Sequence, residues 1–239
     1  MGSDGNSSFN SLQLSLDKRF SGGFTLLANY TWAKAIDFGS GAGTLWPTYS
    51  NPQNHNADRG LSDFNRKHRF VSSWLWELPR LNGSSPAARM VAGGWSLSGI
   101  LILQSGPFFS VRSGRDNSFS GVGLDRVDVV ADITRAAGVD AVSQWYNTKA
   151  FAQNAAGTFG NSGRNIVLGP GLISLNAMAS KTFKLYRENS LQFRAEFFNL
   201  PNHANFDSPR TDNLTSGTYG RLTSAQDPRI LQFGLKYQF

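Results

Sequence analysis

The sequence predicts an all-β protein, namely a segment of an antiparallel, up-and-down transmembrane β-barrel with about seven long strands. Three observations lead to this prediction. Apolar and polar residues alternate along seven segments, the links between the segments are short and long in turn, and aromatic residues are abundant although no long apolar run occurs. Because a β-strand sends successive side chains to opposite faces, the alternation gives each strand one apolar and one polar face.

The alternation defines the strands one by one. The alternating segments are residues 11–17, 24–32, 69–78, 95–111, 172–183, 190–199 and 229–239. The second segment places Tyr30 and Trp32 on one face, and the third does the same with Trp74 and Trp76. Pro79 ends the third, because proline lacks the amide hydrogen that a ladder of strands needs.

The later segments follow the same rule with one exception. The middle of the fourth segment, residues 100–103, is apolar on both faces. The fifth and sixth segments alternate clearly, and the seventh alternates strictly up to the last residue, Phe239. The seventh is also long enough to cross a bilayer as a tilted strand, which takes about 9–11 residues.

The links between the segments differ in length in a regular way. The short links are residues 21–23, 79–93 and 184–189, and the long ones are residues 37–65, 112–171 and 202–228. Outer-membrane barrels have short turns on the periplasmic side and long loops outside, whereas long structureless loops are uncommon in compact soluble domains. Within the second long link, the aromatic stretch 141–152 predicts a short helix packed inside its loop.

Charged residues in the middle of strands keep to the polar faces. They are Arg69, Glu77, Arg194, Glu196 and Lys236. An Arg or Lys in contact with lipid near the bilayer midplane costs about 2–4 kcal/mol, so we expect these five side chains to face the lumen of the barrel.

Composition narrows the function classes. No run approaches the roughly 18 consecutive apolar residues of a transmembrane helix, but a closed barrel can still span lipid. The chain has no cysteine, which excludes disulfides and thiolate metal sites. The net charge is +7, but the basic residues are scattered, so we expect no nucleic-acid partner.

No catalytic or metal-binding pattern stands out. His55, His68 and His203 lie in or beside separate loops without metal-ligand spacing. Residues 125–132 hold three aspartates, which leave a calcium site open beside the simpler reading of solvated loop charges, but the EF-hand spacing is absent. No nucleophile elbow of the GxSxG type occurs. We therefore expect no enzyme and no cofactor.

Aromatic residues in the long links are the candidates for binding. Flat or sugar-like ligands could stack on them at the outer mouth of a barrel. The aromatic residues in or near these links are Trp46, Tyr49, Phe108, Phe109, Trp145, Tyr146 and Phe206. Packing within the loops, or a girdle at the membrane interface, is the alternative interpretation.

Several stretches resemble a known family. They are residues 30–37 (YTWAKAID), 63–70 (DFNRKHRF), 94–99 (GWSLSG), 160–165 (GNSGRN) with 169–171 (GPG), 193–200 (FRAEFFNL) and 227–236 (DPRILQFGLK). They resemble the C-terminal barrel portion of TonB-dependent outer-membrane receptors, of the Oar-like kind that carries an N-terminal carboxypeptidase-regulatory-like domain.

The resemblance implies a barrel of the 22-stranded transporter class with a plugged lumen. Such receptors bind a scarce ligand outside the cell and import it with energy passed on by the TonB complex. It also implies outer-membrane lipid and the barrel-assembly machinery of a Gram-negative bacterium as partners. The alternating end of the chain, Phe233, Leu235, Tyr237 and Phe239, looks like the β-signal that this machinery reads.

The resemblance leads to an expectation about the extent of the chain. Seven strands make up about a third of such a barrel, and residues 1–239 include no plug, TonB-contacting segment or regulatory-like domain. We therefore expect the C-terminal strands of a larger barrel. A small self-contained outer-membrane pore or adhesin, and a soluble β-sandwich binding module, are the alternatives.

Overall fold

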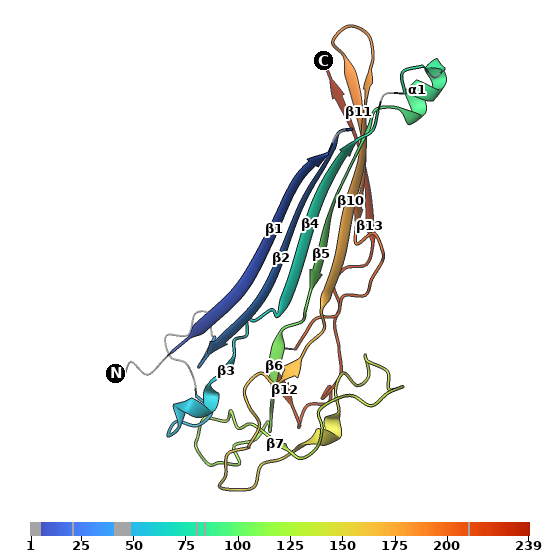
Figure 1. The fold of residues 1–239 in the computed structure, drawn as a ribbon. Helices are drawn as coiled ribbons and strands as arrows, with labels where there is room; N and C mark the ends of the chain where they lie inside the picture. The colour runs from blue at the N-terminus through green and yellow to red at the C-terminus, as the bar shows by residue number, and fades with distance from the viewer. Residues whose placement is uncertain (1–5, 21, 41–48, 80, 84, 210) are drawn as a thin grey trace.

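The computed structural model describes residues 6–20, 22–40, 49–79, 81–83, 85–209 and 211–239. Seven long strands form one antiparallel sheet in the order of the chain, as Figure 1 shows. They are β1 (Ser8–Phe20), β2 (Phe24–Asp37), β4 (His68–Glu77), β5 (Trp95–Gln104), β10 (Leu172–Lys184), β11 (Ser190–Phe198) and β13 (Ile230–Gln238). We call this sheet the wall. Its up-and-down order and its seven strands confirm the predicted fold class.

The strand register places the apolar rows of all seven strands on one face. Directly opposed residues of an antiparallel pair share a face. One such row runs from Leu14 through Tyr30, Phe70 and Leu103 to Ile173. The same register continues through β11 to β13, where Phe193 is opposite Leu235. We call this side of the wall the apolar face and the other side the polar face.

The polar face carries the five charges that the sequence assigned to it. The register places all five on the side of the sheet that faces away from the apolar rows. They are Arg69, Glu77, Arg194, Glu196 and Lys236. Arg194 and Glu196 form an ion pair of 3.5 Å. Residues 100–103, which are apolar on both faces, contribute Ile100 to a shallow apolar patch on this side that also contains Leu75 and Met178.

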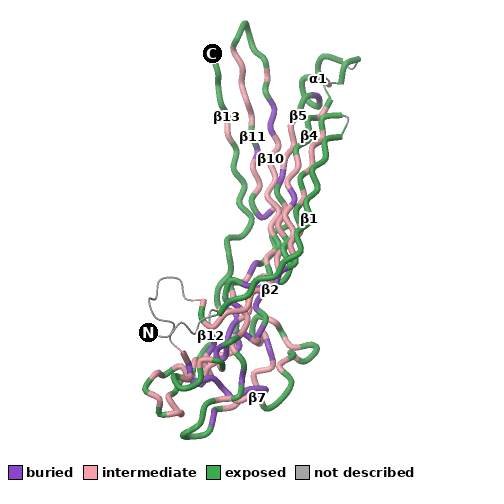
Figure 2. The backbone as a smooth tube through the Cα atoms, turned by 60° about the vertical axis from the view of Figure 1, so that its left-hand side comes forward, coloured by how far each residue is buried: buried purple, intermediate pink, exposed green. Residues whose placement is uncertain are grey.

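The wall buries very little of its own surface. All thirteen residues of β1 are exposed, and Leu235 on β13 is 71% exposed. A soluble β-sandwich buries one face of each sheet against a second sheet, about 10 Å away. No second layer covers the apolar face of the described strands (Figure 2), so the sandwich alternative is wrong.

The two ends of the wall differ, as Figure 1 shows. One end holds the short turns and helix α1 (Pro86–Ala92), which lies in the link between β4 and β5. The other end holds the long connections, and β3 (Gly60–Leu61) extends the sheet there by pairing with the end of β2. Among the described residues, no helix is both long and apolar enough to cross a bilayer.

The long connections fold into a compact unit, which we call the loop cap: the described residues of 49–67, 105–171 and 199–229. Its elements are η1 (His55–Asp58), β6 (Phe108–Arg112), β7 (Asp128–Val129), η2 (Thr148–Ala150), β8 (Phe151–Ala152), β9 (Val167–Leu168) and β12 (Thr211–Asn213). β6 pairs with β9 and, in parallel, with β12, and β7 pairs with β8.

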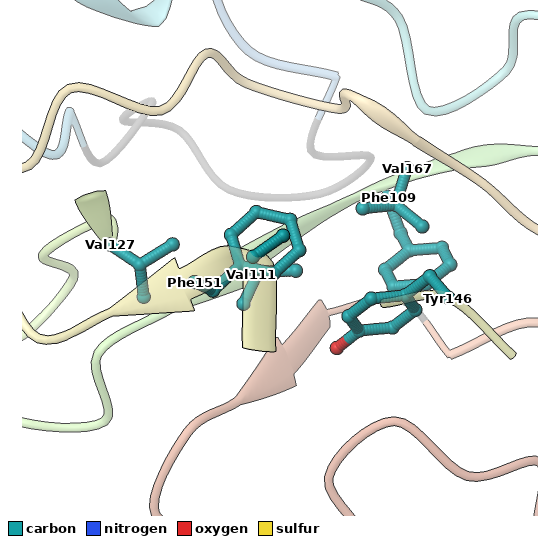
Figure 3. Packing of buried hydrophobic residues seen from close by; sticks show 7 residues of the cluster. Phe109, Val111, Val127, Tyr146, Phe151 and Val167 are labelled. Atoms are coloured by element: carbon teal, nitrogen blue, oxygen red, sulfur yellow. The ribbon is translucent and has the colours of Figure 1, made fainter. Parts of the chain in front are cut away.

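The loop cap has a buried apolar core, which Figure 3 shows from close by. Its members come from the three strands β6, β8 and β9, from η2 and from the connections between them: Phe109, Val111, Val127, Tyr146, Ala150, Phe151 and Val167. Tyr146 makes edge contacts with the rings of Phe109 and Phe151. The purple segments in Figure 2 gather in this unit, whereas the strands of the wall are mostly pink and green.

One prediction for this region is wrong, and another is confirmed in part. The segment 95–111 is not one strand, because β5 ends at Gln104 and β6 belongs to the loop cap. The strand is interrupted at Gly106 and Pro107, where the Pro107 carbonyl accepts a hydrogen bond from the Gly169 amide at 2.7 Å. The short helix predicted within residues 141–152 is only the 3-10 turn η2, which packs in the core of the loop cap and is followed by β8.

Candidate ligand site at the loop end of the wall

Arg164 connects the loop cap to the wall. Its Nη1 is 2.5 Å from a carboxylate oxygen of Asp37, the last residue of β2, and its Nη2 is 3.1 Å from a carboxylate oxygen of Asp63. Nη2 also donates to the hydroxyl of Ser40 at 2.7 Å. The Arg164 and Asp37 side chains are only 11% and 18% exposed. Charge-assisted bonds of this kind are stronger than neutral ones, so Arg164 fixes the position of two loops.

Two asparagines complete this connection. Asn65 accepts a hydrogen bond from the Ala35 amide at 2.8 Å, which holds the loop against β2. Asn165 has a left-handed backbone (φ 54°), which asparagine tolerates better than most residues. The side-chain nitrogen of Asn165, Nδ2, donates to the Asp63 carboxylate at 2.6 Å and to the Leu61 carbonyl at 2.7 Å.

A second ion pair joins the first long connection to the second. Arg126 Nη1 is 2.6 Å from Asp58, and both side chains are 8% exposed. Asp58 also accepts hydrogen bonds from the Ser50 amide and hydroxyl, and Arg126 donates to the Ala57 carbonyl. Burial lowers the pKa of the neighbouring Arg112, and the charge of Arg126 adds to this effect. Separating the two loops would leave both charges without their partner, and an unpaired buried charge is strongly destabilising. The ion pair therefore holds the two loops together.

A cleft of about 710 Å³ lies at the loop end of the wall, beside Ser40 and Asp63, which both bind Arg164. We call it the junction cleft. It is lined by Ser40, Asp63, Phe64, Arg66, Gln104, Ser105, Gly106, Pro107, Phe108, Pro170, Gly171, Leu172, Phe206, Asp207, Ser208, Pro209 and Gln226. Small-molecule sites typically measure about 300–1,000 Å³ and combine an apolar lining with a few polar groups. The junction cleft is of this size, and polar and apolar groups contribute to its lining in similar proportion.

The chemistry of the junction cleft comes from three aromatic rings and a guanidinium. Phe64, Phe108 and Phe206 offer flat apolar surfaces. Arg66 donates from Nη1 to the carbonyls of Asp63 and Asn65 at 3.1 and 2.9 Å, and among the described residues no partner binds its other nitrogens. Burial lowers the pKa of Arg66, but a guanidinium stays charged at neutral pH. The cleft therefore suits a flat or amphipathic ligand with an acceptor group.

Of the aromatic residues expected at the outer mouth, Tyr49, Trp145 and Tyr146 do not line this cleft. Trp46 lies outside the described residues. Tyr49 stacks on His55 with ring centroids 3.9 Å apart. Trp145 donates from its indole nitrogen to the Leu168 carbonyl at 2.6 Å. With Tyr30 it lines a groove that adjoins the junction cleft and shares Gln104, Leu172 and Phe206 with it.

Tyr146 is a core residue, which corrects its expected place at the surface. It is 4% exposed, and its hydroxyl donates to the Asp212 carboxylate at 2.7 Å. Burial, together with the charge of Asp212, raises the pKa of Tyr146 well above its ordinary value. Burial also raises the pKa of the neighbouring Tyr219 to about 12. An aromatic residue in a loop gives the same sequence signal whether it packs inward or outward.

Phe108 and Phe206, two of the aromatic residues named as possible ligand contacts, line the cleft, whereas Phe64 and Arg66 were not predicted as a site. Phe64 and Arg66 lie in the stretch 63–70, which carries the family resemblance. Phe108 was also assigned to a wall strand, but it belongs to β6 of the loop cap.

The remaining candidates have structural partners. His68 shares a hydrogen bond of 2.8 Å with the Tyr30 hydroxyl, and His203 shares one of 3.0 Å with Asn205. Asp125 accepts hydrogen bonds from the amide and hydroxyl of Ser118. Within the described ranges, no three His, Asp or Glu side chains gather closely enough to hold a metal ion.

The end of the chain presents its alternating residues on the apolar face. Phe233, Leu235, Tyr237 and Phe239 are between 53% and 97% exposed. Tyr237 and Phe239 stack with ring centroids 6.2 Å apart. The side chains expected to form the β-signal therefore stand free on the last strand of the wall.

Comparison with known proteins gives one finding. A family model described as an outer membrane beta barrel domain matches residues 1–232. No curated protein and no solved structure matches the chain.

Proposed function

The chain belongs to the outer membrane β-barrel domain family, and from that premise we propose that it is the C-terminal wall of a TonB-dependent receptor that takes up a ligand. The wall lies in the bacterial outer membrane, with lipid against its apolar face. We further propose that the ligand binds at the junction cleft and that the complete receptor imports it with energy from TonB.

One observation carries the proposal: the segments that resemble TonB-dependent receptors meet beside the junction cleft. Asp37, Asp63 and Arg164 come from three of these segments and form one ion-pair network. Asn65 and Asn165, from two of the same segments, bind the backbone of their neighbours. A shared junction of wall and loops, with a cleft of ligand size next to it, supports a binding role for the loop end.

The free edges of the wall support the proposal that it is part of a larger barrel. β1 and β13 are the two edges of the sheet, and within the described residues neither has a second neighbouring strand. Membrane barrels are closed because an unpaired strand edge in lipid leaves backbone groups without hydrogen bonds. Single-chain bacterial barrels also have an even number of strands. We propose that further strands close the barrel between β13 and β1.

Ligand binding is tested with the purified protein in detergent. Thermal stability is measured against a panel of ferric siderophores, cobalamin, oligosaccharides and short peptides. We expect at least one class to raise the melting temperature, and the Phe64→Ala and Arg66→Ala variants to lose that shift. Phe119→Ala is the matched control, because Phe119 is 74% exposed and lies outside the cleft. A shift that survives both cleft variants would place the binding site elsewhere.

Energy coupling is tested with the full-length gene product in its own cells. We expect uptake of the ligand found in the screen to stop when the gene for TonB is deleted. Uptake that continues without TonB contradicts this part of the proposal. Ion conductance of residues 1–239 alone in a planar bilayer would instead support a self-contained pore.

A further inference from the structure

We propose that helix α1 is a membrane-surface anchor that rests among the phospholipid headgroups beside the turn end of the wall. The inference builds on the proposed orientation of the wall, in which the apolar face meets lipid and the short turns lie at the periplasmic side. Its partner is a phospholipid of the periplasmic leaflet.

Two donors from the apolar face hold α1 on the lipid side of the wall. Lys181 shares the apolar face with Trp95 and Phe193, which are opposite it in the register. Its ammonium donates to the carbonyls of Gly93 and Arg89 at the C-terminal end of α1. The indole nitrogen of Trp95 donates to the Val91 carbonyl at 2.8 Å. Because both anchors stand on the apolar face, they hold the C-terminal end of α1 on the lipid side of the wall.

The composition of α1 suits a lipid surface better than water. Six of its seven residues are apolar (PAARMVA), and none of them is buried. Met90 and Val91 are 66% and 71% exposed. The Ser85 side chain caps the first turn by accepting from the Ala88 amide, but an isolated helix this short is marginal in water. An apolar environment around Met90 and Val91 would stabilise it.

The surroundings of α1 match a headgroup region in charge and in aromatic content. Arg89 and Met90 of the helix and Trp95, Lys181 and Phe183 of the apolar face line a cavity of about 1120 Å³ at the turn end of the wall. The cavity continues around this end to residues of the polar face, among them Glu77 and Gln192. The ammonium of Lys181 lies 5.3 Å from the centre of the Phe183 ring. Aromatic rings and basic side chains are typical of the membrane interface, where the bases meet lipid phosphate. On the apolar side of this cavity, Met90, Trp95 and Phe183 offer apolar surface for acyl chains, and Arg89 and Lys181 offer cations for a phosphate.

Because the chain contains no cysteine, a single introduced cysteine can be labelled at a chosen position. Met90→Cys is labelled with an environment-sensitive fluorophore, and the protein is reconstituted in vesicles of phosphatidylethanolamine and phosphatidylglycerol with or without brominated acyl chains. Met90 is exposed, so the label does not disturb packing. Leu101→Cys reports on the apolar face in the middle of the wall, and Val130→Cys, in the loop cap, is the control in water.

We expect blue-shifted emission and strong quenching by brominated lipid at positions 90 and 101, and neither effect at position 130. Quenching at 101 without quenching at 90 overturns the anchor and leaves the orientation of the wall intact. If position 101 is also unquenched, then the lipid-facing wall fails, and the proposed function fails with it.

Discussion

Leu235 and Phe233 in the wall are 71% and 65% exposed, whereas Phe109 and Val111 in the loop cap are 1% exposed. The same residue classes are thus placed outward in one region and inward in the other. The wall has two-residue periodicity and no second layer, while the loop cap has short strands and a buried cluster. The difference indicates that the two regions have different surroundings. The exposed apolar side chains of the wall suit lipid, whereas the loop cap buries its apolar side chains as a domain in water does.

The largest loss of stability is expected when a side chain in the buried core of the loop cap is truncated. Phe109→Ala removes a ring that contacts Tyr146, and truncating a fully buried Phe costs about 3–5 kcal/mol. Phe233→Ala removes an exposed ring and leaves no internal cavity. Limited proteolysis in detergent, read out at the loop cap, compares the two. Equal protection of the Phe109→Ala and Phe233→Ala proteins would contradict the difference between the regions.

The next effect concerns the two faces of a single strand. Ala28 and Asn29 are neighbours on β2, and the register places Ala28 on the apolar face and Asn29 on the polar face. Ala28→Arg puts a cation against lipid and costs about 2–4 kcal/mol near the midplane, whereas Asn29→Arg adds to a polar surface. Urea titration of folding into phospholipid vesicles measures both. Similar midpoints for the two variants would mean that the faces are wrongly assigned.

A smaller effect is expected at a glycine of the apolar face. A Cβ at Gly99 would lie 2.7–2.9 Å from the indole ring of Trp74, so Gly99→Ala forces this ring to move. Overpacking of this kind costs about 1–3 kcal/mol. Gly234→Ala is the matched control, because nothing lies within 4 Å of its added carbon. Both are compared by folding yield in lipid, and equal yields would show that Trp74 does not pack on Gly99.

The smallest effect is a loosening of the loop cap at high pH. The folded state holds the Tyr219 proton up to a pKa of about 12, whereas an unfolded tyrosine releases it near 10. The unfolded chain thus loses this proton first, and the stability of the loop cap falls as the pH rises above about 10. Tyrosinate absorbance should show a late component that the Tyr146→Phe and Tyr219→Phe variants reduce. A titration without this component contradicts the buried positions of these rings.

The wall could be predicted from the sequence because its signal is local. In each strand the residue pattern itself repeats with the period of a β-strand, and all seven long strands were found in this way. The error at residues 95–111 arose because the alternation continues past Pro107, although a proline inside a strand pattern argues for a break. Helix α1 was not predicted, although Ser85 followed by Pro86 is a signal for the start of a helix.

The candidate site could be predicted only in part because its contacts are not local. Arg164 and Asp37 are 127 positions apart, and no periodicity links them. The parallel pairing of β6 with β12 likewise depends on how three long connections fold together. The sequence marked the stretches that contain Asp63 and Arg164, but it could not show that they enclose a cleft.

The apolar face of the wall should meet hydrocarbon, and a spin-label scan along β10 in phospholipid vesicles measures this directly. Single cysteines from residue 173 to residue 180 are labelled, and each label is exposed in turn to oxygen, which concentrates in lipid, and to a water-soluble nickel chelate. We predict a two-residue period, with oxygen favoured at 173, 175, 177 and 179 and the chelate favoured at the positions between them. Equal access of the chelate to both rows, or a period out of phase with the apolar rows, would contradict a lipid-facing wall.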